Sequence, residues 1–122
     1  MLASLALACG GEASHVSSDL VFKHSQATGT GQLRPGWTLV WVGREIDDVT
    51  QIVHRVRVIP EYAGEILLLS GSQRRELVGE VACPKADAAI WQELESSQDV
   101  VIQLETERGS FAEVSCRRAI RP

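Results

Sequence analysis

The chain has 122 residues, of which 44% are hydrophobic and 23% charged, and its formal net charge is -4 at pH 7. This length suffices for one domain with a real core, and the composition is that of an ordered globular protein. The acidic balance argues against a nucleic-acid-binding protein, which normally carries a basic stripe, and no apolar run approaches the roughly 20 residues of a membrane-spanning helix.

Residues 1–11, MLASLALACGG, form a short apolar run that ends in small residues and a cysteine. This run resembles the end of a bacterial lipoprotein signal, in which a peptidase cuts before the cysteine that receives the lipid. Ala8 and Cys9 match those two positions. We expect residues 1–14 to be a signal-like segment and tether, and residues 15–122 a single β domain. The alternative is an N-terminal strand or helix with Cys9 as a small buried residue.

The first half of the domain reads as strands. Alternating apolar and polar residues predict a strand over 15–24, and a Gly-, Thr- and Pro-rich loop follows over 25–36. Residues 37–42 are expected to be a central strand covered on both faces, with Trp37, Leu39 and Trp41 sharing one of them.

The acidic residues that follow read as an exposed turn. Residues 51–59 then show the half-buried pattern, with Ile52, His54, Val56 and Val58 on one face.

The second half contains one helix candidate. Residues 65–70 and 77–83 are expected to pair as a hairpin, and residues 84–97 form a helix that begins near Pro84. A final hairpin over 99–120 turns at Gly109. These elements predict a mainly β fold, an antiparallel β-sandwich or partly open barrel of about seven strands with one short helix.

Three cysteines allow one lipid anchor and one pair. If Cys9 carries the lipid, Cys83 and Cys116 remain as an even pair, which suits an oxidising compartment. Both lie at inward alternation positions, so a disulfide between neighbouring strands is geometrically sensible. The alternative is a pair of buried free thiols.

The sequence shows no set of residues for catalysis, a metal or a cofactor. His15, His24 and His54 are scattered, no GxSxG elbow or CxxC spacing occurs, and no phosphate-binding glycine loop is present. His54 lies on an apolar strand face, where a hydrogen-bonded boundary histidine is common. We therefore expect a protein that is not an enzyme and has no cofactor.

Three residues are candidates for binding a partner. Arg55 and Arg57 share the polar face of their strand and could meet an acidic group, although charged side chains also protect a solvated sheet edge. Trp91 lies at one edge of the apolar stripe of the expected helix, where it serves either a partner or the core.

A lipoprotein signal, a polar tether and a compact β domain without a catalytic set resemble the pilotins of type III secretion systems, the YscW-type outer-membrane lipoproteins. The resemblance is carried by Ala8 and Cys9, by the strands over 37–42 and 51–59, and by the β organisation up to residue 120. It implies a lipid-anchored protein on the periplasmic face of the bacterial outer membrane. The implied partner is a C-terminal segment of the secretin, whose targeting and assembly the pilotin assists by binding it at a sheet edge or in an apolar groove.

Two other functions fit the same elements. The domain could be a barrel that encloses a small apolar ligand. It could also be an exported enzyme inhibitor that uses the loop over 25–36.

Overall fold

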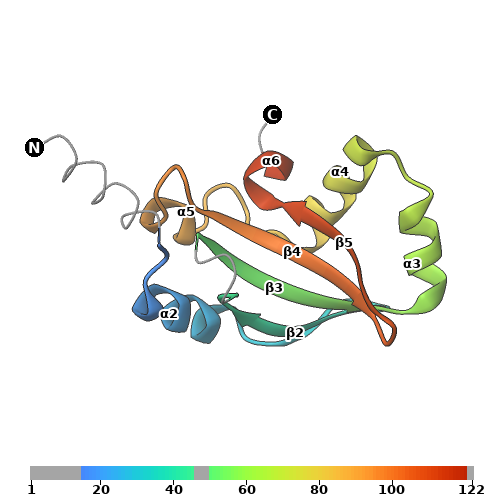
Figure 1. Cartoon of the computed structure of the whole chain (residues 1–122), viewed down its shortest axis with the longest axis horizontal. Helices are drawn as coiled ribbons and strands as arrows, with labels where there is room; N and C mark the ends of the chain where they lie inside the picture. Colours follow the sequence, from blue (N-terminus) through green and yellow to red (C-terminus); the bar gives the residue numbers. More distant parts are fainter. Residues whose placement is uncertain (1–14, 46–49, 121–122) are drawn as a thin grey trace, which may run out of the picture.

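The structure is a computed structural model that describes residues 15–45 and 50–120. In this part of the chain, five strands form one mixed sheet in the order β1-β2-β3-β4-β5, and the helices contribute to a core on one of its faces (Figure 1). The expected sandwich or barrel of about seven antiparallel strands is wrong, because several segments expected to be strands are helices.

The strands are β1 (Gly31–Arg34), β2 (Trp37–Gly43), β3 (Gln51–Val58), β4 (Asp99–Thr106) and β5 (Gly109–Ser115). The helices are α2 (Ser18–Thr28), α3 (Pro60–Leu67), α4 (Gly71–Ala82), α5 (Ile90–Glu93) and α6 (Cys116–Ile120). Only β3 and β4 run parallel, and the other neighbours are antiparallel. A parallel pair needs a long crossover, which α3, α4 and α5 supply. Figure 1 shows α3 at one end of the molecule and α2 and α5 at the other.

The segment expected to be the first strand is largely the helix α2. The Ser17 Oγ accepts a hydrogen bond from the backbone N–H of Leu20 at 3.1 Å and so caps the first turn. Leu20, Val21 and His24 are half-buried at the spacing of one helix face. The loop expected over 25–36 is also wrong, because it contains the end of α2 and the whole of β1.

The hairpin expected around residue 71 is the helix pair α3–α4. Pro60 occupies the start of α3, where its fixed φ favours the helix. Ser70 and Gln73 form a capping box at the start of α4, since each side chain accepts a hydrogen bond from the other residue's backbone N–H, at 3.2 and 3.0 Å. These signals for the start of a helix outweigh the strand propensity of the leucine run between them.

The helix expected over 84–97 is wrong in its extent, because only the four residues of α5 are helical there. Ile90 and Leu94, which belong to the expected apolar stripe, are buried. The expected final hairpin is confirmed as β4 and β5, with φ of 120° at Gly109. Its last residues are not strand, because the chain enters α6 at Cys116.

A β-bulge redirects the aromatic residues of β2. Leu39 pairs with Val56 and Trp41 pairs with Arg55, so Val40 is an extra residue in the ladder. Trp37 and Leu39 point into the core, whereas Trp41 lies on the opposite face beside Arg55. The expectation of one shared face is wrong beyond the bulge. Cover on both faces is also wrong, because Val40 and its neighbour Thr38 are exposed.

The core lies between one face of the sheet and the helices. The half-buried pattern expected for β3 is confirmed, because the inward residues of β3 are buried while Arg57 is exposed. The inward rows of β3 and β4 pair directly, and their members are Ile52 with Val100, His54 with Ile102, and Val56 with Leu104. Ile66, Val78 and Ile90 close this core from α3, α4 and α5.

Candidate functional site

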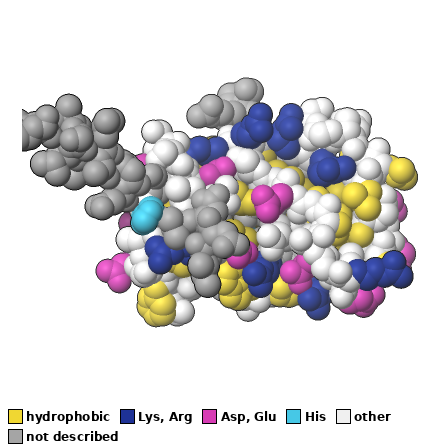
Figure 2. Space-filling view, viewed as in Figure 1, with side chains coloured by type: hydrophobic (Ala, Val, Ile, Leu, Met, Phe, Trp, Pro, Cys, Tyr) yellow, Lys and Arg dark blue, Asp and Glu magenta, His cyan; other side chains and the backbone are white. Residues whose placement is uncertain are grey.

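Exposed apolar side chains gather at the two ends of α3. Ile59 precedes the helix and is 40% exposed, Leu67 ends it and is 52% exposed, and Leu68 follows at 88%. In Figure 2 hydrophobic side chains appear at the right of the molecule, where Figure 1 places α3. We call Ile59, Leu67, Leu68 and the two cavities beside the helix the α3 surface. Exposed apolar side chains gathered beside recesses are typical of interaction sites.

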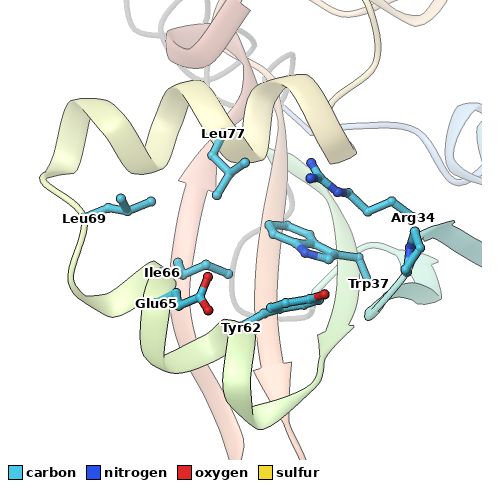
Figure 3. A pocket seen from close by; sticks show the side chains of 8 residues that line it. Arg34, Trp37, Tyr62, Glu65, Ile66, Leu69 and Leu77 are labelled. Atoms are coloured by element: carbon cyan, nitrogen blue, oxygen red, sulfur yellow. The ribbon is translucent and has the colours of Figure 1, made fainter.

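The first cavity, the aromatic pocket, has a volume of about 390 Å³ and lies between the β1–β2 turn, α3 and α4. Its apolar lining comprises Pro35, Trp37, Tyr62, Ile66, Leu69 and Leu77. Figure 3 shows Arg34 and Glu65 on opposite sides of this lining. Neither charged side chain makes an ion pair within the described residues, so both are free to meet a ligand. The pocket combines an aromatic floor with one cation and one anion.

Gly36 shapes this pocket. Its φ is 85°, and a Cβ at this position would lie 2.3 Å from the Tyr62 ring. The backbone carbonyl of Gly36 accepts a hydrogen bond from the Ile59 N–H at 3.1 Å, which ties the β1–β2 turn to the start of α3. A glycine is therefore needed both for the turn and for the close approach of Tyr62.

The second cavity lies on the other flank of α3 and has a volume of about 460 Å³. Ala63 and Leu67 line it from the helix, and residues 106–111 of the β4–β5 turn line its far side. The short helix α3 thus stands between two recesses with leucines exposed at its end. A surface of this shape suits an apolar segment of another protein better than a compact small molecule.

Arg55 and Arg57, two of the candidate partner contacts, form ion pairs within the chain. The Arg55 guanidinium lies 4.4 Å from the centre of the Trp41 ring and pairs with Glu45 at 3.2 Å. Arg57 pairs with Glu105 at 2.6 Å across the parallel strands. Both lie on the sheet face opposite the helices and away from the α3 surface.

Trp91 packs within the domain. The indole Nε1 donates a hydrogen bond to the Pro84 carbonyl at 3.4 Å, and the Arg117 guanidinium lies 5.2 Å from the ring centre. Arg117 also donates to the carbonyls of Glu95 and Gln98 at 2.7 and 2.6 Å. The ring is half-buried and joins α5 to α6.

The structure brings Cys83 and Cys116 together in a disulfide whose Cα atoms are 5.5 Å apart. The sequence had suggested a bridge between neighbouring strands, but the bridge joins two helix ends. Cys83 caps the end of α4 and Cys116 begins α6. Cys9, the expected lipid site, lies outside the described residues.

The contact between His24 and His54 could not be predicted from the residue pattern. Their Nε2 atoms are 2.9 Å apart, with His24 on α2 and His54 on β3. Burial, and to a smaller extent the neighbouring His24, lowers the pKa of His54 from 6.5 to about 3. Burial also lowers the pKa of His24, against the opposing effect of the Glu93 carboxylate. The contact forms because α2, a helix, places His24 over the sheet. The strand expected over 15–24 did not predict it.

No group of three or more His, Cys, Asp or Glu side chains in the described part of the chain is arranged to hold a metal ion. Among these same residues, no helix is long and apolar enough to cross a membrane.

A comparison of the chain with protein-family models gave no match, and comparisons with curated proteins and with solved structures gave none either.

Proposed function

We propose that the chain is an exported binding module that holds an apolar segment of a partner protein on the α3 surface. The observation that carries the proposal is the coincidence of exposed Leu67 and Leu68 with a recess on each flank of α3. The pilotin resemblance names the partner, a C-terminal segment of a type III secretin. A lipid on Cys9 would then take the complex to the periplasmic face of the outer membrane.

The groove suits this role better than the β1 edge of the sheet. The outer edge of β1 has only four residues, so an added strand would gain few main-chain hydrogen bonds. The aromatic pocket offers Trp37 and Tyr62 for apolar burial, and aromatic residues of this kind dominate binding energies at interfaces. Arg34 at its rim can meet an acidic group next to the apolar segment.

The disulfide supports export. Disulfides persist in oxidising compartments such as the periplasm and are rare in the cytosol. The bond between Cys83 and Cys116 therefore fits a protein that works outside the cytosol.

The two other functions lose the elements on which they depended. A ligand-enclosing barrel needs a closed sheet, and this sheet is open with β1 and β5 at its edges. An inhibitor loop over 25–36 is replaced by the end of α2 and by β1.

The test uses synthetic peptides that cover the C-terminal segment of a type III secretin, titrated into the protein while tryptophan fluorescence is recorded. We expect micromolar binding to at least one peptide. Leu68→Glu should weaken it by about tenfold or more, because a buried leucine contributes about 1.5–3 kcal/mol. Phe22→Glu is the matched control, since Phe22 is 66% exposed on α2, away from α3.

The outcomes separate the two parts of the proposal. Equal loss of affinity in Leu68→Glu and Phe22→Glu would exclude the α3 surface as the binding site. Absence of binding to every peptide at high micromolar concentration would exclude the secretin as partner. Mass spectrometry of the membrane-extracted native protein tests the anchor, and a Cys9 without acyl groups would remove the pilotin role.

A further inference from the structure

A separate cavity of about 440 Å³ lies between α2 and the end of α4 together with the segment that follows it. Most of its lining is apolar: Leu20 and Ala27 come from α2, Val81 and Ala82 from α4, and Ile90 from α5. It shares no lining residue with the two cavities of the α3 surface. Its volume falls in the range of sites for small organic ligands, roughly 300–1,000 Å³.

The histidine pair lines this cavity. The His24 and His54 ring centres are 5.1 Å apart while their Nε2 atoms are 2.9 Å apart, so the rings meet corner to corner. One Nε2–H donates to the other Nε2, and the Thr28 Oγ lies 3.3 Å from His24 Nε2. Burial lowers the pKa of both rings, so both are uncharged at neutral pH. The pair is a polar but uncharged part of the lining.

One unbalanced charge remains in the lining. Lys23 and Glu93 neutralise each other in an ion pair of 3.1 Å. Lys85 also lines the cavity and makes no ion pair with any residue that the structure describes. The cavity therefore carries an apolar interior and one excess positive charge, which favours a ligand with a single negative charge.

We propose that this cavity binds a small amphipathic carboxylate, with the apolar chain along the α2 and α4 walls and the carboxylate at Lys85. The site is independent of the α3 surface, because none of the residues that carry one proposal takes part in the other.

Octanoate, 1-octanol and octylamine share one chain length and differ in charge, so they are the probes. The ring signals of His24 and His54 are followed by NMR at pH 7 during each titration. We expect a saturable shift with octanoate at a dissociation constant of roughly 1 mM, which is ordinary for a ligand of this size. 1-Octanol should bind about fivefold more weakly, and octylamine more weakly still. Equal affinity for the three probes, or no saturable shift with octanoate, would overturn the proposal.

Two variants locate the ligand. Lys85→Gln should weaken octanoate about fivefold and leave 1-octanol unchanged, with Arg108→Gln on the distant β4–β5 turn as its control. Ala27→Trp should block both probes by filling the cavity, with the exposed Ala86→Trp as its control. Unchanged octanoate binding in Lys85→Gln contradicts the site even if Ala27→Trp fails to fold.

Discussion

His54 is the one titratable side chain that is buried in the described part of the chain, and its position couples folding to pH. It lies on the core face of β3 between Val56 and Ile52, and among the described residues its imidazole meets one other titratable ring, that of His24. A protonated His54 would carry its charge in the core, away from water, and no described carboxylate is hydrogen-bonded to it. The uncharged ring is therefore the form that the native state keeps.

The protein should lose stability on mild acidification. The pKa of His54 falls from 6.5 in the unfolded chain to about 3 in the native state, so below pH 6.5 the unfolded chain binds a proton that the native chain does not. The free energy of unfolding should drop by about 1.4 kcal/mol per pH unit from this residue, between pH 6.5 and about 3. Urea unfolding at a series of pH values measures this slope.

His54→Leu should flatten that slope, because it removes the group that the unfolded chain protonates. His15→Asn is the control, since His15 is exposed at the start of the described chain and is not part of the histidine pair. A slope that is the same in His54→Leu and in the wild type would show that the histidine pair does not control acid stability.

The residue pattern predicted part of this behaviour. It placed His54 on the apolar face of its strand, which is where the structure has it. It could not predict the partner, because His24 is 30 residues away and meets His54 only when the segment before β1 is a helix. The β-bulge at Val40 is similar, since no residue type before Trp41 requires it and the pairing with β3 decides it.

At the scale of elements, the helices α4 and α6 pack closely against each other. Gly79 lies in the middle of α4, and a Cβ there would lie 2.9 Å from the Cβ of Ala119 on α6. Gly64 lies in the middle of α3, and a Cβ there would have nothing within 4 Å. The same residue type therefore has a packing role in one helix and none in the other.

Alanine substitutions should separate these two glycines. Gly64→Ala should raise the free energy of unfolding by about 0.5–1 kcal/mol, because alanine favours a helix and the site has space. Gly79→Ala should lower it by about 1 kcal/mol, because α6 must move to admit the methyl group. Urea midpoints with unchanged m-values provide the measurement, and equal stabilisation by both substitutions would show that the α4–α6 contact is loose.

The segments of α3 and α4 were expected to be strands because short apolar runs fit both structures. The run 65–70 has no clear period, and Gly64 and Gly71 flank it as turn residues flank a strand. The signals for helices were nevertheless present, in Pro60 at the start of α3 and in the Ser70 and Gln73 capping box of α4.

At the scale of the whole molecule, the disulfide closes the part of the chain that completes the sheet. It joins Cys83 after α4 to Cys116 at the start of α6, so α5, β4 and β5 lie within the closed segment. That segment supplies β4, which pairs in parallel with β3 from outside it.

Loss of this bond should cost about 3–4 kcal/mol of unfolding free energy, since a sequence separation of 33 residues restricts the unfolded chain by that amount. Reduction of the wild type and the double substitution Cys83→Ala, Cys116→Ala should have similar effects in urea titrations. Reductant should not change the double variant, which serves as the control. A loss below about 1 kcal/mol would show that the unfolded chain gains little freedom on reduction.

Residue patterns alone predicted the inward face of β3, the β4–β5 hairpin and the cysteine pair that the structure joins. These features depend on alternation within a strand, on a turn glycine and on a count of cysteines, all of which are local or compositional. The overall architecture required contacts between distant segments. Whether a short apolar run becomes a strand or a helix depends on the surface against which it packs.

The candidate sites also depend on distant contacts. The α3 surface exists because residues 60–67 form a helix. It also needs Gly36, which leaves room for Tyr62 beside the β1–β2 turn. The histidine-lined cavity exists because α2 and the end of α4 flank the same part of the sheet. Arg55 and Arg57 were candidates for binding a partner, and the structure pairs them with the carboxylates of Glu45 and Glu105. Long-range packing decides which polar groups are neutralised internally and which remain available for a ligand.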